Sequence, residues 1–155
     1  MTDHHYRLAV EWTGDRGTGT SGYRDYDRAI TVRAEGRPDL LASADRTFHG
    51  DAARWNPEEM LVAALSTCHL LSYLHVASRD GVVVMAYTDE AGGTMVQEGI
   101  GGHFTEVVLR PVVTVTDAAM IERATAAHHD ASQACFIAAS VNFPVRHEPT
   151  VLVAG

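Results

Sequence analysis

Two thiols are the side chains of this sequence best suited to redox chemistry. Cys68 lies in the middle of NPEEMLVAALSTCHLLSYLHVA, residues 56–77, and Cys135 follows much later in the chain. A redox-active pair needs one thiolate that a cation or a helix N-terminus stabilises, and a second thiol within disulfide reach. A free cysteine can also serve as a small buried apolar residue, so both interpretations stay open for Cys68.

The surroundings that a reactive Cys68 would need can be stated from its position. Cys68 lies beyond the first turn of its predicted helix, where the effect of the helix dipole has faded. A cation is therefore required. A guanidinium suits this role better than an ammonium, because it stays charged when partly desolvated and its fork can hold a carboxylate and a second anion together.

The nine histidines raise the possibility of a metal site. His128 and His129 are adjacent and point to different helix faces, and His69 and His75 are six residues apart, unlike the i, i+4 pairs of helical zinc ligands. We therefore expect no metal and no cofactor. We interpret His69 as a core histidine, although its place beside Cys68 also allows hydrogen bonding or proton transfer.

The segment around Cys68 has clear helix boundaries. Asn56 suits the N-cap, Pro57 suits the first turn, Glu59 can reach back as in a capping box, and Gly81 supplies the stop. Charged and histidine side chains interrupt the apolar run, so we interpret it as a buried core helix and not as a membrane span. A helix that is apolar all round must be enclosed, and one sheet from a short chain covers mainly one side. Burial thus favours a homodimer.

The other elements predict an α+β domain over residues 1–155. Strands are expected at residues 6–12 and 28–34, joined by the glycine-rich TGDRGTGTSG, and residues 35–55 are expected to form a long surface connection. After the Cys68 helix, VVVMAYTDE and TEVVLRPVVTVTD are expected to be strands separated by glycine-rich turns at Gly92, Gly93 and residues 99–102. A second helix then begins at a cap, Asp117, and runs to about Gln133, and residues 141–145 form a closing strand. This order lacks the repeated strand-helix units of a parallel sheet.

Composition narrows the class of function. With 155 residues and 46% hydrophobic content, the chain is long enough for one domain with a real core. The formal charge of -8 without a basic stripe argues against a nucleic-acid partner. The N-terminus has neither a secretory signal nor a transit peptide, so we expect a cytoplasmic protein. In that compartment two cysteines are not a disulfide scaffold.

Four stretches resemble one known family. NPEEMLVAALSTC resembles the Asn-Pro-Glu-Glu helix of the OsmC/Ohr superfamily, the osmotically inducible and organic-hydroperoxide-resistance proteins. In that family a peroxidatic cysteine follows the first glutamate by ten residues, which is the spacing of Glu58 and Cys68 here. WTGDRGTGT resembles the hairpin that carries the family's catalytic arginine. That arginine falls on Arg16, with Arg24 and Arg28 as alternatives, and the family's resolving cysteine falls on Cys135.

The resemblance implies a metal-free thiol peroxidase. Its fold would be an intertwined homodimer in which antiparallel sheets wrap around two central helices. The Cys68 thiolate would reduce an organic hydroperoxide and become a sulfenic acid, Cys135 would form a disulfide with it, and an external dithiol would reduce that disulfide. Such a protein would be an antioxidant of the stress response. Glu58 and Cys68 are about 15 Å apart along one helix, so Glu58 is expected to orient Arg16 from the other subunit.

Departures from the family and two other functions stay open. Phe136 stands where the family usually has proline, His69 where it usually has an apolar residue, and Arg54 and Trp55 replace the usual Gly-Thr. These differences alter the pocket and not the thiol pair, so they bear on which substrate and which reductant the protein uses. The alternative function is a non-catalytic binding protein that holds an apolar or thiol-linked ligand in the interfacial cavity. A redox sensor is the third possibility, weakened by the lack of a DNA-binding motif.

Overall fold

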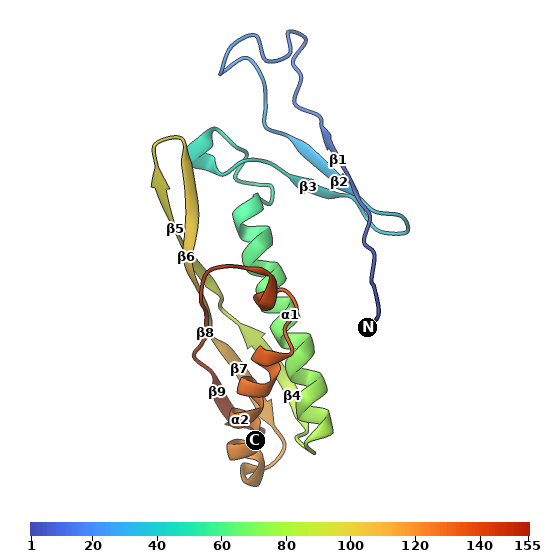
Figure 1. Cartoon of the computed structure of the whole chain (residues 1–155), viewed down its shortest axis with the longest axis vertical. Helices are drawn as coiled ribbons and strands as arrows, with labels where there is room; N and C mark the ends of the chain where they lie inside the picture. Colours follow the sequence, from blue (N-terminus) through green and yellow to red (C-terminus); the bar gives the residue numbers. More distant parts are fainter. The chain divides into compact units, whose positions relative to one another are not determined.

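The computed structural model describes residues 1–155, which form two compact units, residues 1–60 and residues 61–155. Helix α1 (Pro57–Arg79) begins in the first unit and lies mostly in the second. Figure 1 labels the elements of both units. The single domain predicted over residues 1–155 stays a prediction.

The N-terminal unit is built on a small antiparallel sheet. Its strands are β1 (Ala9–Trp12), β2 (Ile30–Arg33) and β3 (Leu40–Ala42), in the order β1-β2-β3. The expected hairpin is present, with shorter strands than predicted. The expected surface connection at residues 35–55 was wrong in part, since it contains β3 and a short 3-10 helix, η1 (Arg46–Phe48). Three-residue elements are too short to show a periodic pattern.

Helix α1 ends because of the conformation of one glycine, Gly81. Gly81 has a φ of 71°, the left-handed conformation that glycine adopts without a steric penalty. This conformation lets Gly81 N–H donate to the Ser78 carbonyl (3.3 Å) and Val82 N–H donate to the Ala77 carbonyl (2.8 Å). The two bonds form a Schellman motif, and Val82 and Ala77 belong to one apolar cluster. The predicted stop is confirmed.

The C-terminal unit contains two sheets of three strands. Its strands are β4 (Val84–Asp89), β5 (Gly92–Glu98), β6 (Gly101–Leu109), β7 (Pro111–Val115), β8 (Val145–His147) and β9 (Thr150–Val153). The sheets have the orders β4-β7-β9 and β5-β6-β8. Pairs β4–β7 and β5–β6 are antiparallel, whereas β6–β8 and β7–β9 are parallel. The unit therefore has the α+β character expected from the sequence, with mixed sheets.

Three strand predictions in this unit need correction. The single strand expected at TEVVLRPVVTVTD is two, because the chain leaves β6 at Arg110 and re-enters a sheet at Pro111. Gly93, expected in a turn, lies inside β5, where an added Cβ would be 2.7 Å from the Phe104 ring. Its missing side chain thus permits close packing. The closing strand predicted at residues 141–145 overlaps β8 only at Val145, and the chain continues through β8 and β9 beyond that range.

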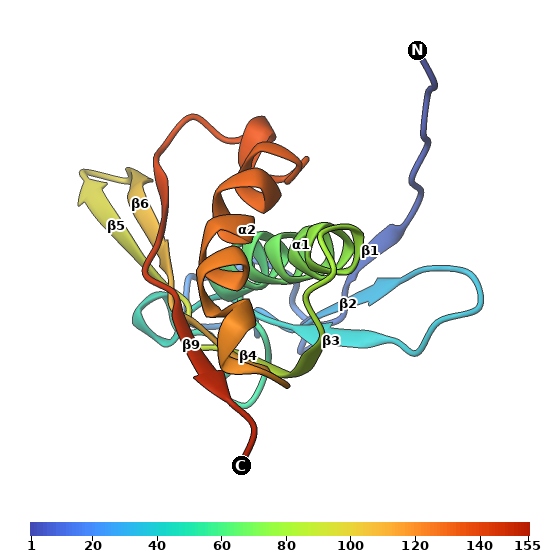
Figure 2. The same cartoon turned by 90° about the horizontal axis from the view of Figure 1, so that it is seen from below.

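Helix α2 (Ile121–Gln133) packs beside α1 in the C-terminal unit. Asp117 accepts a hydrogen bond from Ala119 N–H (2.8 Å), so the predicted cap begins a short 3-10 helix, η2 (Ala118–Met120), that leads into α2. A third 3-10 turn, η3 (Ala138–Ser140), follows Cys135. Figures 1 and 2 both show α1 and α2 side by side.

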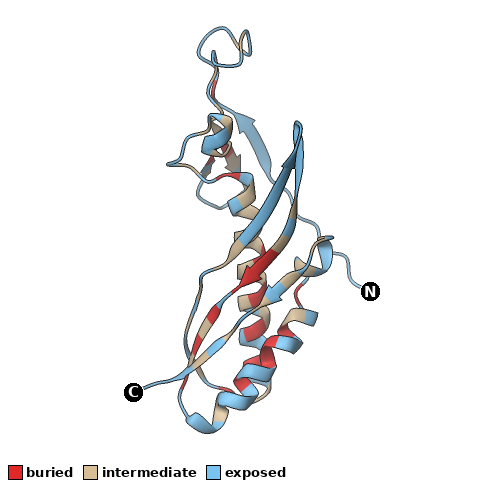
Figure 3. Cartoon of the chain, turned by 90° about the vertical axis from the view of Figure 1, so that its left-hand side faces the viewer, coloured by how far each residue is buried: buried red, intermediate tan, exposed pale blue.

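The core of the C-terminal unit consists of two apolar clusters that α1 joins. The larger cluster lies between α1, α2 and the β4-β7-β9 sheet and includes Tyr73 and Val113. The smaller cluster contains Leu65, Val107 and Leu109 at the inner end of β6. Figure 3 shows this gradient along β6, which is exposed at its start and buried at its last three residues. On α1, His69 lies one turn after Leu65 and one turn before Tyr73, between the clusters.

Helix α1 is long and apolar enough to cross a membrane by length and composition alone, a test that the core helix of a soluble protein also passes. Its buried residues form one stripe, made of Leu65, His69, Tyr73, Val76 and Ala77. Leu71, by contrast, is 65% exposed. The single chain therefore covers one face of a helix that is apolar on several.

Candidate functional site

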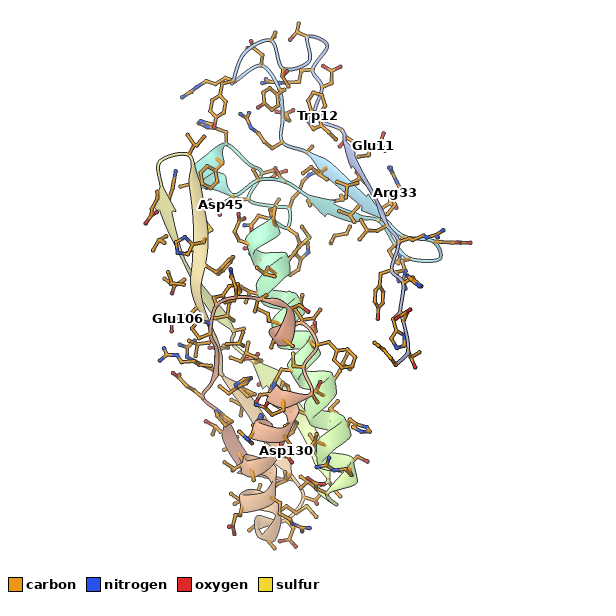
Figure 4. All side chains as sticks on the ribbon, viewed as in Figure 1. Glu11, Trp12, Arg33, Asp45, Glu106 and Asp130 are labelled. Atoms are coloured by element: carbon orange, nitrogen blue, oxygen red, sulfur yellow. The ribbon has the colours of Figure 1, made fainter.

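The N-terminus of α1 is held by a reciprocal capping box. Asn56 Oδ1 accepts from Glu59 N–H (2.8 Å), and Glu59 Oε2 accepts from Asn56 N–H (3.4 Å). Asn56 Nδ2 also donates to Asp45 (3.4 Å), whose carboxylate accepts from Thr47 N–H (2.7 Å) at the start of η1. Figure 4 labels Asp45 in this loop. Both predicted capping roles are confirmed.

The first glutamate of the Asn-Pro-Glu-Glu stretch has an unmatched carboxylate oxygen. Oε2 of Glu58 is buried and has no hydrogen-bond partner. A buried carboxylate oxygen without a donor is costly, because its desolvation is not repaid by a bond. Glu58 therefore presents a free acceptor that a guanidinium could satisfy.

The structure brings the two thiols together. Cys68 on α1 and Cys135, two residues after α2, are free thiols that lie close enough for a bond between them to affect the pKa of Cys135. Cys68 is half-buried, whereas Cys135 is 2% exposed. Burial, and secondly the bond to Cys68, raise the pKa of the Cys135 thiol to about 11. At neutral pH Cys135 is thus a buried protonated thiol, and Cys68 is the member of the pair that a solute can reach.

Arg16 is engaged within the connection between β1 and β2. Its Nη2 donates to the Arg24 carbonyl, and its Nε lies 3.7 Å from an Asp27 carboxylate oxygen. Asp15 organises this turn by accepting from Gly17 N–H and Gly19 N–H, at 2.8 Å each. Glu58 is not among the partners of Arg16 in the structure. Arg16 is therefore in a solvent-exposed turn with weak ion pairing.

The alternative arginine at position 28 is held more firmly. Its guanidinium lies over the rings of Tyr23 and Tyr26, at 4.6 Å and 4.2 Å from their centroids. It also donates to the carbonyls of the same two residues. Arg24 supplies only its carbonyl, to Arg16.

Further along the sheet of the same unit, ion pairs join neighbouring strands. Figure 4 labels Glu11 and Arg33, which pair across β1 and β2, while Arg33 also binds Asp39 at 3.1 Å.

The N-terminal unit also contains a cavity of about 390 Å³. Its lining is charged, and includes Arg28, Arg54, Asp27, Asp51 and His49. Arg54 and Asp51 form an ion pair across it, with nitrogen and oxygen 3.5 Å apart. Such a lining suits polar ligands better than apolar ones.

A cluster of histidines lies in the core between α1, α2 and β8. His69 Nε2 and His128 Nδ1 are 3.1 Å apart and hydrogen-bonded, and the rings of His69 and His147 have centroids 4.2 Å apart. Tyr73 stacks on His128 at 4.0 Å and donates to the Ala124 carbonyl at 2.9 Å. Burial, with smaller effects from neighbouring histidines, lowers the pKa of His69 to about 3 and that of His128 to about 4.

The edge of this cluster is polar as well. Burial lowers the pKa of the half-buried His147, and the charge of Asp89 opposes that effect. Asp89 accepts from the Ser66 hydroxyl (2.5 Å) and from Arg110 N–H (2.7 Å).

Sequence reasoning placed His69 in the core but did not find its partners, since His128 and His147 come from distant segments. The one available signal was proximity in the sequence, since His69 directly follows Cys68 and His128 precedes Cys135 by seven residues.

The fold and the paired thiols place the chain in a known class. Residues 49–150 match the family model described as OsmC-like protein. The chain therefore belongs to the OsmC-like family, as the resemblance implied, and the matched range includes residues of both compact units.

Individual relatives agree with this assignment. An OsmC-like protein of unknown function from Vibrio cholerae O1 biovar eltor has a structure that matches with a TM-score of 0.83 and 34% identity, covering 96% of this chain and 99% of that one. An organic hydroperoxide resistance protein from Elizabethkingia anophelis matches with a TM-score of 0.68 and 18% identity, covering 99% and 100%. The uncharacterized protein YmaD of Bacillus subtilis (strain 168) is 25% identical, covering 100% of this chain and 99% of the relative.

Proposed function

We propose that this protein is a thiol-dependent peroxidase that reduces organic hydroperoxides. The observation that carries the proposal is the pairing of a half-buried thiol, Cys68, with a buried thiol, Cys135, inside the OsmC-like fold. The family contains proteins named for organic hydroperoxide resistance, among them structural neighbours of this chain. A peroxidase cycle that passes through an internal disulfide uses this kind of pair, one thiol accessible and the other within disulfide reach.

The proposed reaction has three balanced steps. The Cys68 thiolate attacks the terminal oxygen of the hydroperoxide, the O–O bond breaks, and the alkoxide takes a proton to leave as an alcohol. Cys68 is then a sulfenic acid. The Cys135 thiol forms a disulfide with it, and the sulfenic oxygen leaves as water. An external dithiol restores both thiols by two exchange steps and is itself oxidised to a disulfide.

Arg16 and Glu58 are proposed to complete the site in a homodimer. A guanidinium near the Cys68 sulfur would stabilise the thiolate and hold a peroxide oxygen, and the unmatched oxygen of Glu58 is the acceptor that would orient it. Glu58 lies about 15 Å along the axis of α1 from Cys68, so one helix cannot supply both groups to one site. The proposal therefore places Glu58 of one subunit beside the Cys68 of the other. The exposed apolar residues of α1, such as Leu71, support an interface on this helix.

Peroxide consumption by wild type and by two cysteine variants tests the proposal. With an alkyl hydroperoxide and a dithiol reductant, Cys68→Ser should abolish turnover. With the reductant left out, Cys135→Ser should still consume about one equivalent of peroxide and accumulate a sulfenic acid that dimedone traps. Gln133→Ala, at an exposed position of α2, is the control and should match wild type.

Failure of this assay would have a definite meaning. If wild type and Cys68→Ser are equally inert with several alkyl hydroperoxides, the thiols do not perform peroxidase chemistry. The alternative, a binding protein that holds an apolar or thiol-linked ligand, would then be tested by native mass spectrometry of the purified protein.

A further inference from the structure

The histidine pair that joins α1 to α2 has the geometry of a directional link. His69 is 0% exposed and His128 is 3% exposed, and their facing nitrogens are 3.1 Å apart. We call this contact the imidazole bridge. The residues above and below His69 on α1, Leu65 and Tyr73, belong to separate apolar clusters. The bridge is therefore a buried polar contact with apolar packing on both sides along α1 and the His147 ring beside His69, and a buried hydrogen bond is stronger than one in water.

The protonation of the bridge is constrained by its own atoms. A neutral imidazole has one N–H and one lone pair, so one ring donates and the other accepts. The outer nitrogens, His69 Nδ1 and His128 Nε2, are buried and have no partner. In either tautomer one of them carries a hydrogen and the other a lone pair. The fold thus contains one hydrogen bond between the rings and two buried ring nitrogens without a partner. Leaving those two nitrogens unpaired costs desolvation free energy, so two apolar residues would fill this part of the core at a lower cost.

The bridge and the thiol pair connect the same two segments. His69 directly follows Cys68 on α1, and His128 lies on α2 seven residues before Cys135, which comes just after the end of that helix. Tyr73, one turn further along α1, donates to the Ala124 carbonyl one turn earlier on α2. Successive residues along α1 therefore contact successively earlier residues of the second segment, which means that α1 and α2 are antiparallel.

The axial register of two helices decides which side chains meet. Apolar side chains pack tolerably after a small slide of one helix along the other, because hydrophobic contacts are not directional. A hydrogen bond between fixed rings is lost by the same slide, since it weakens steeply with distance and angle. The alanines that face α1 from α2, Ala124, Ala127 and Ala131, offer little resistance to sliding. The imidazole bridge is a directional contact that resists this sliding of α2 along α1.

We propose that His69 and His128 are positioning residues that fix the register of α2 against α1 and so hold Cys135 within disulfide reach of Cys68. The inference rests on the proposed redox role of the two cysteines. Its direct consequence is that the bridge raises the effective concentration of one thiol at the other.

An equilibrium measurement tests the inference without any peroxide. In a glutathione redox buffer, the two thiols and one oxidised glutathione give the Cys68–Cys135 disulfide and two reduced glutathiones, so two electrons pass to glutathione. The equilibrium constant of this exchange reports how well the fold apposes the two sulfurs. It is measured by trapping free thiols with a maleimide and by mass spectrometry.

Isomeric amide variants isolate the bonding atom. The amide of Gln reaches the place of a histidine Nε2, and the amide of Asn reaches the place of Nδ1. The pair His69→Gln and His128→Asn therefore retains a polar atom where the bridge needs one, whereas His69→Asn and His128→Gln displace it. We expect the equilibrium constant to stay within about twofold of wild type in the first pair and to fall about tenfold in the second. His75→Asn and His129→Gln, at exposed histidines of the same helices, should leave it unchanged.

Two further measurements separate register from stability. Urea unfolding of the reduced proteins gives the free energy of unfolding of each variant, and only folded variants enter the comparison. In wild type, a ¹⁵N–¹⁵N coupling between His69 and His128 in NMR spectra would report the bridge directly. If the Asn and Gln isomers have equal equilibrium constants at either position, the positioning role is wrong. If the isomers differ while wild type consumes no peroxide, the inference stands and the proposed peroxidase does not.

Discussion

At the scale of the residue, Cys135 sets the pH dependence of the resolving step. Burial is the largest cause of its raised pKa of about 11, and we expect that cause to act also when Cys68 is a sulfenic acid. The reactive thiolate is then a minor form at neutral pH, and its fraction grows about tenfold per pH unit below the pKa. We expect the rate of disulfide formation to rise accordingly between pH 7 and pH 9.

Stopped-flow mixing of reduced protein with one equivalent of alkyl hydroperoxide would measure that rate, with the disulfide quantified after an acid quench. A rate that is flat over this range would contradict the prediction, because it would show that Cys135 already reacts as a thiolate at pH 7.

The buried histidines predict acid sensitivity of the fold. An unfolded histidine has a pKa of about 6.5, whereas burial lowers the pKa of His69 to about 3 and that of His128 to about 4. Below pH 6.5 the unfolded chain therefore binds protons that the folded chain does not. Each ring lowers the free energy of unfolding by up to about 1.4 kcal/mol per pH unit, so stability is lost as the pH falls from 6.5 toward 4.

Urea unfolding at pH 7 and pH 5 checks this prediction. His128→Asn should reduce the loss between the two pH values, because it removes one of the rings whose pKa is lowered by burial. His129→Asn, at the exposed neighbouring position, should show the full wild-type loss.

At the scale of the element, Asn56 ties the beginning of α1 to the loop before it. Its side chain accepts from Glu59 N–H and donates to Asp45, and the residue is 8% exposed. Asn56→Ala removes both bonds and should lower the free energy of unfolding by about 1 to 2 kcal/mol. Thermal unfolding followed by circular dichroism measures this, with Asn142→Ala at an exposed loop position as control. Equal melting temperatures for both variants would show that the cap contributes nothing.

Sequence reasoning predicted elements whose signals are local. The boundaries of α1 follow from Asn56, Glu59 and Gly81, whose hydrogen bonds span five residues or fewer. Features that depend on distant partners were missed. Gly93 reads as a turn residue until Phe104 is seen to pack against it.

The candidate site likewise contains some features that the sequence predicted and others that depend on distant partners. The spacing of Glu58 and Cys68, together with the family resemblance, indicated the thiol pair. The histidine cluster could not be predicted, because His69, His128 and His147 come from three elements and no spacing along the chain connects them. The roles of Arg16 and Glu58 stay predictions.

At the scale of the whole molecule, the proposed homodimer predicts a specific weak point. Leu71 and Leu74 are exposed on the side of α1 away from its buried stripe. A lysine at position 71 would place a charge in an apolar interface, so Leu71→Lys should convert a dimer into monomers and reduce peroxidase turnover. Light scattering after size-exclusion chromatography measures the mass. Ile100→Lys, in the exposed turn between β5 and β6, is the control, and a monomeric wild type would overturn the proposal.

The parallel pairing of the last two strands sets the order in which the protein can form during synthesis. β8 joins β6 and β9 joins β7, so each sheet of the C-terminal unit gains its third strand from residues 145–153. The β1-β2-β3 sheet, by contrast, is finished by residue 42. Contacts between distant segments are slow to form, and here they must wait for residues 145–153 to emerge. A ribosome-bound nascent chain will therefore carry a formed first sheet while the thiol-bearing unit is still incomplete.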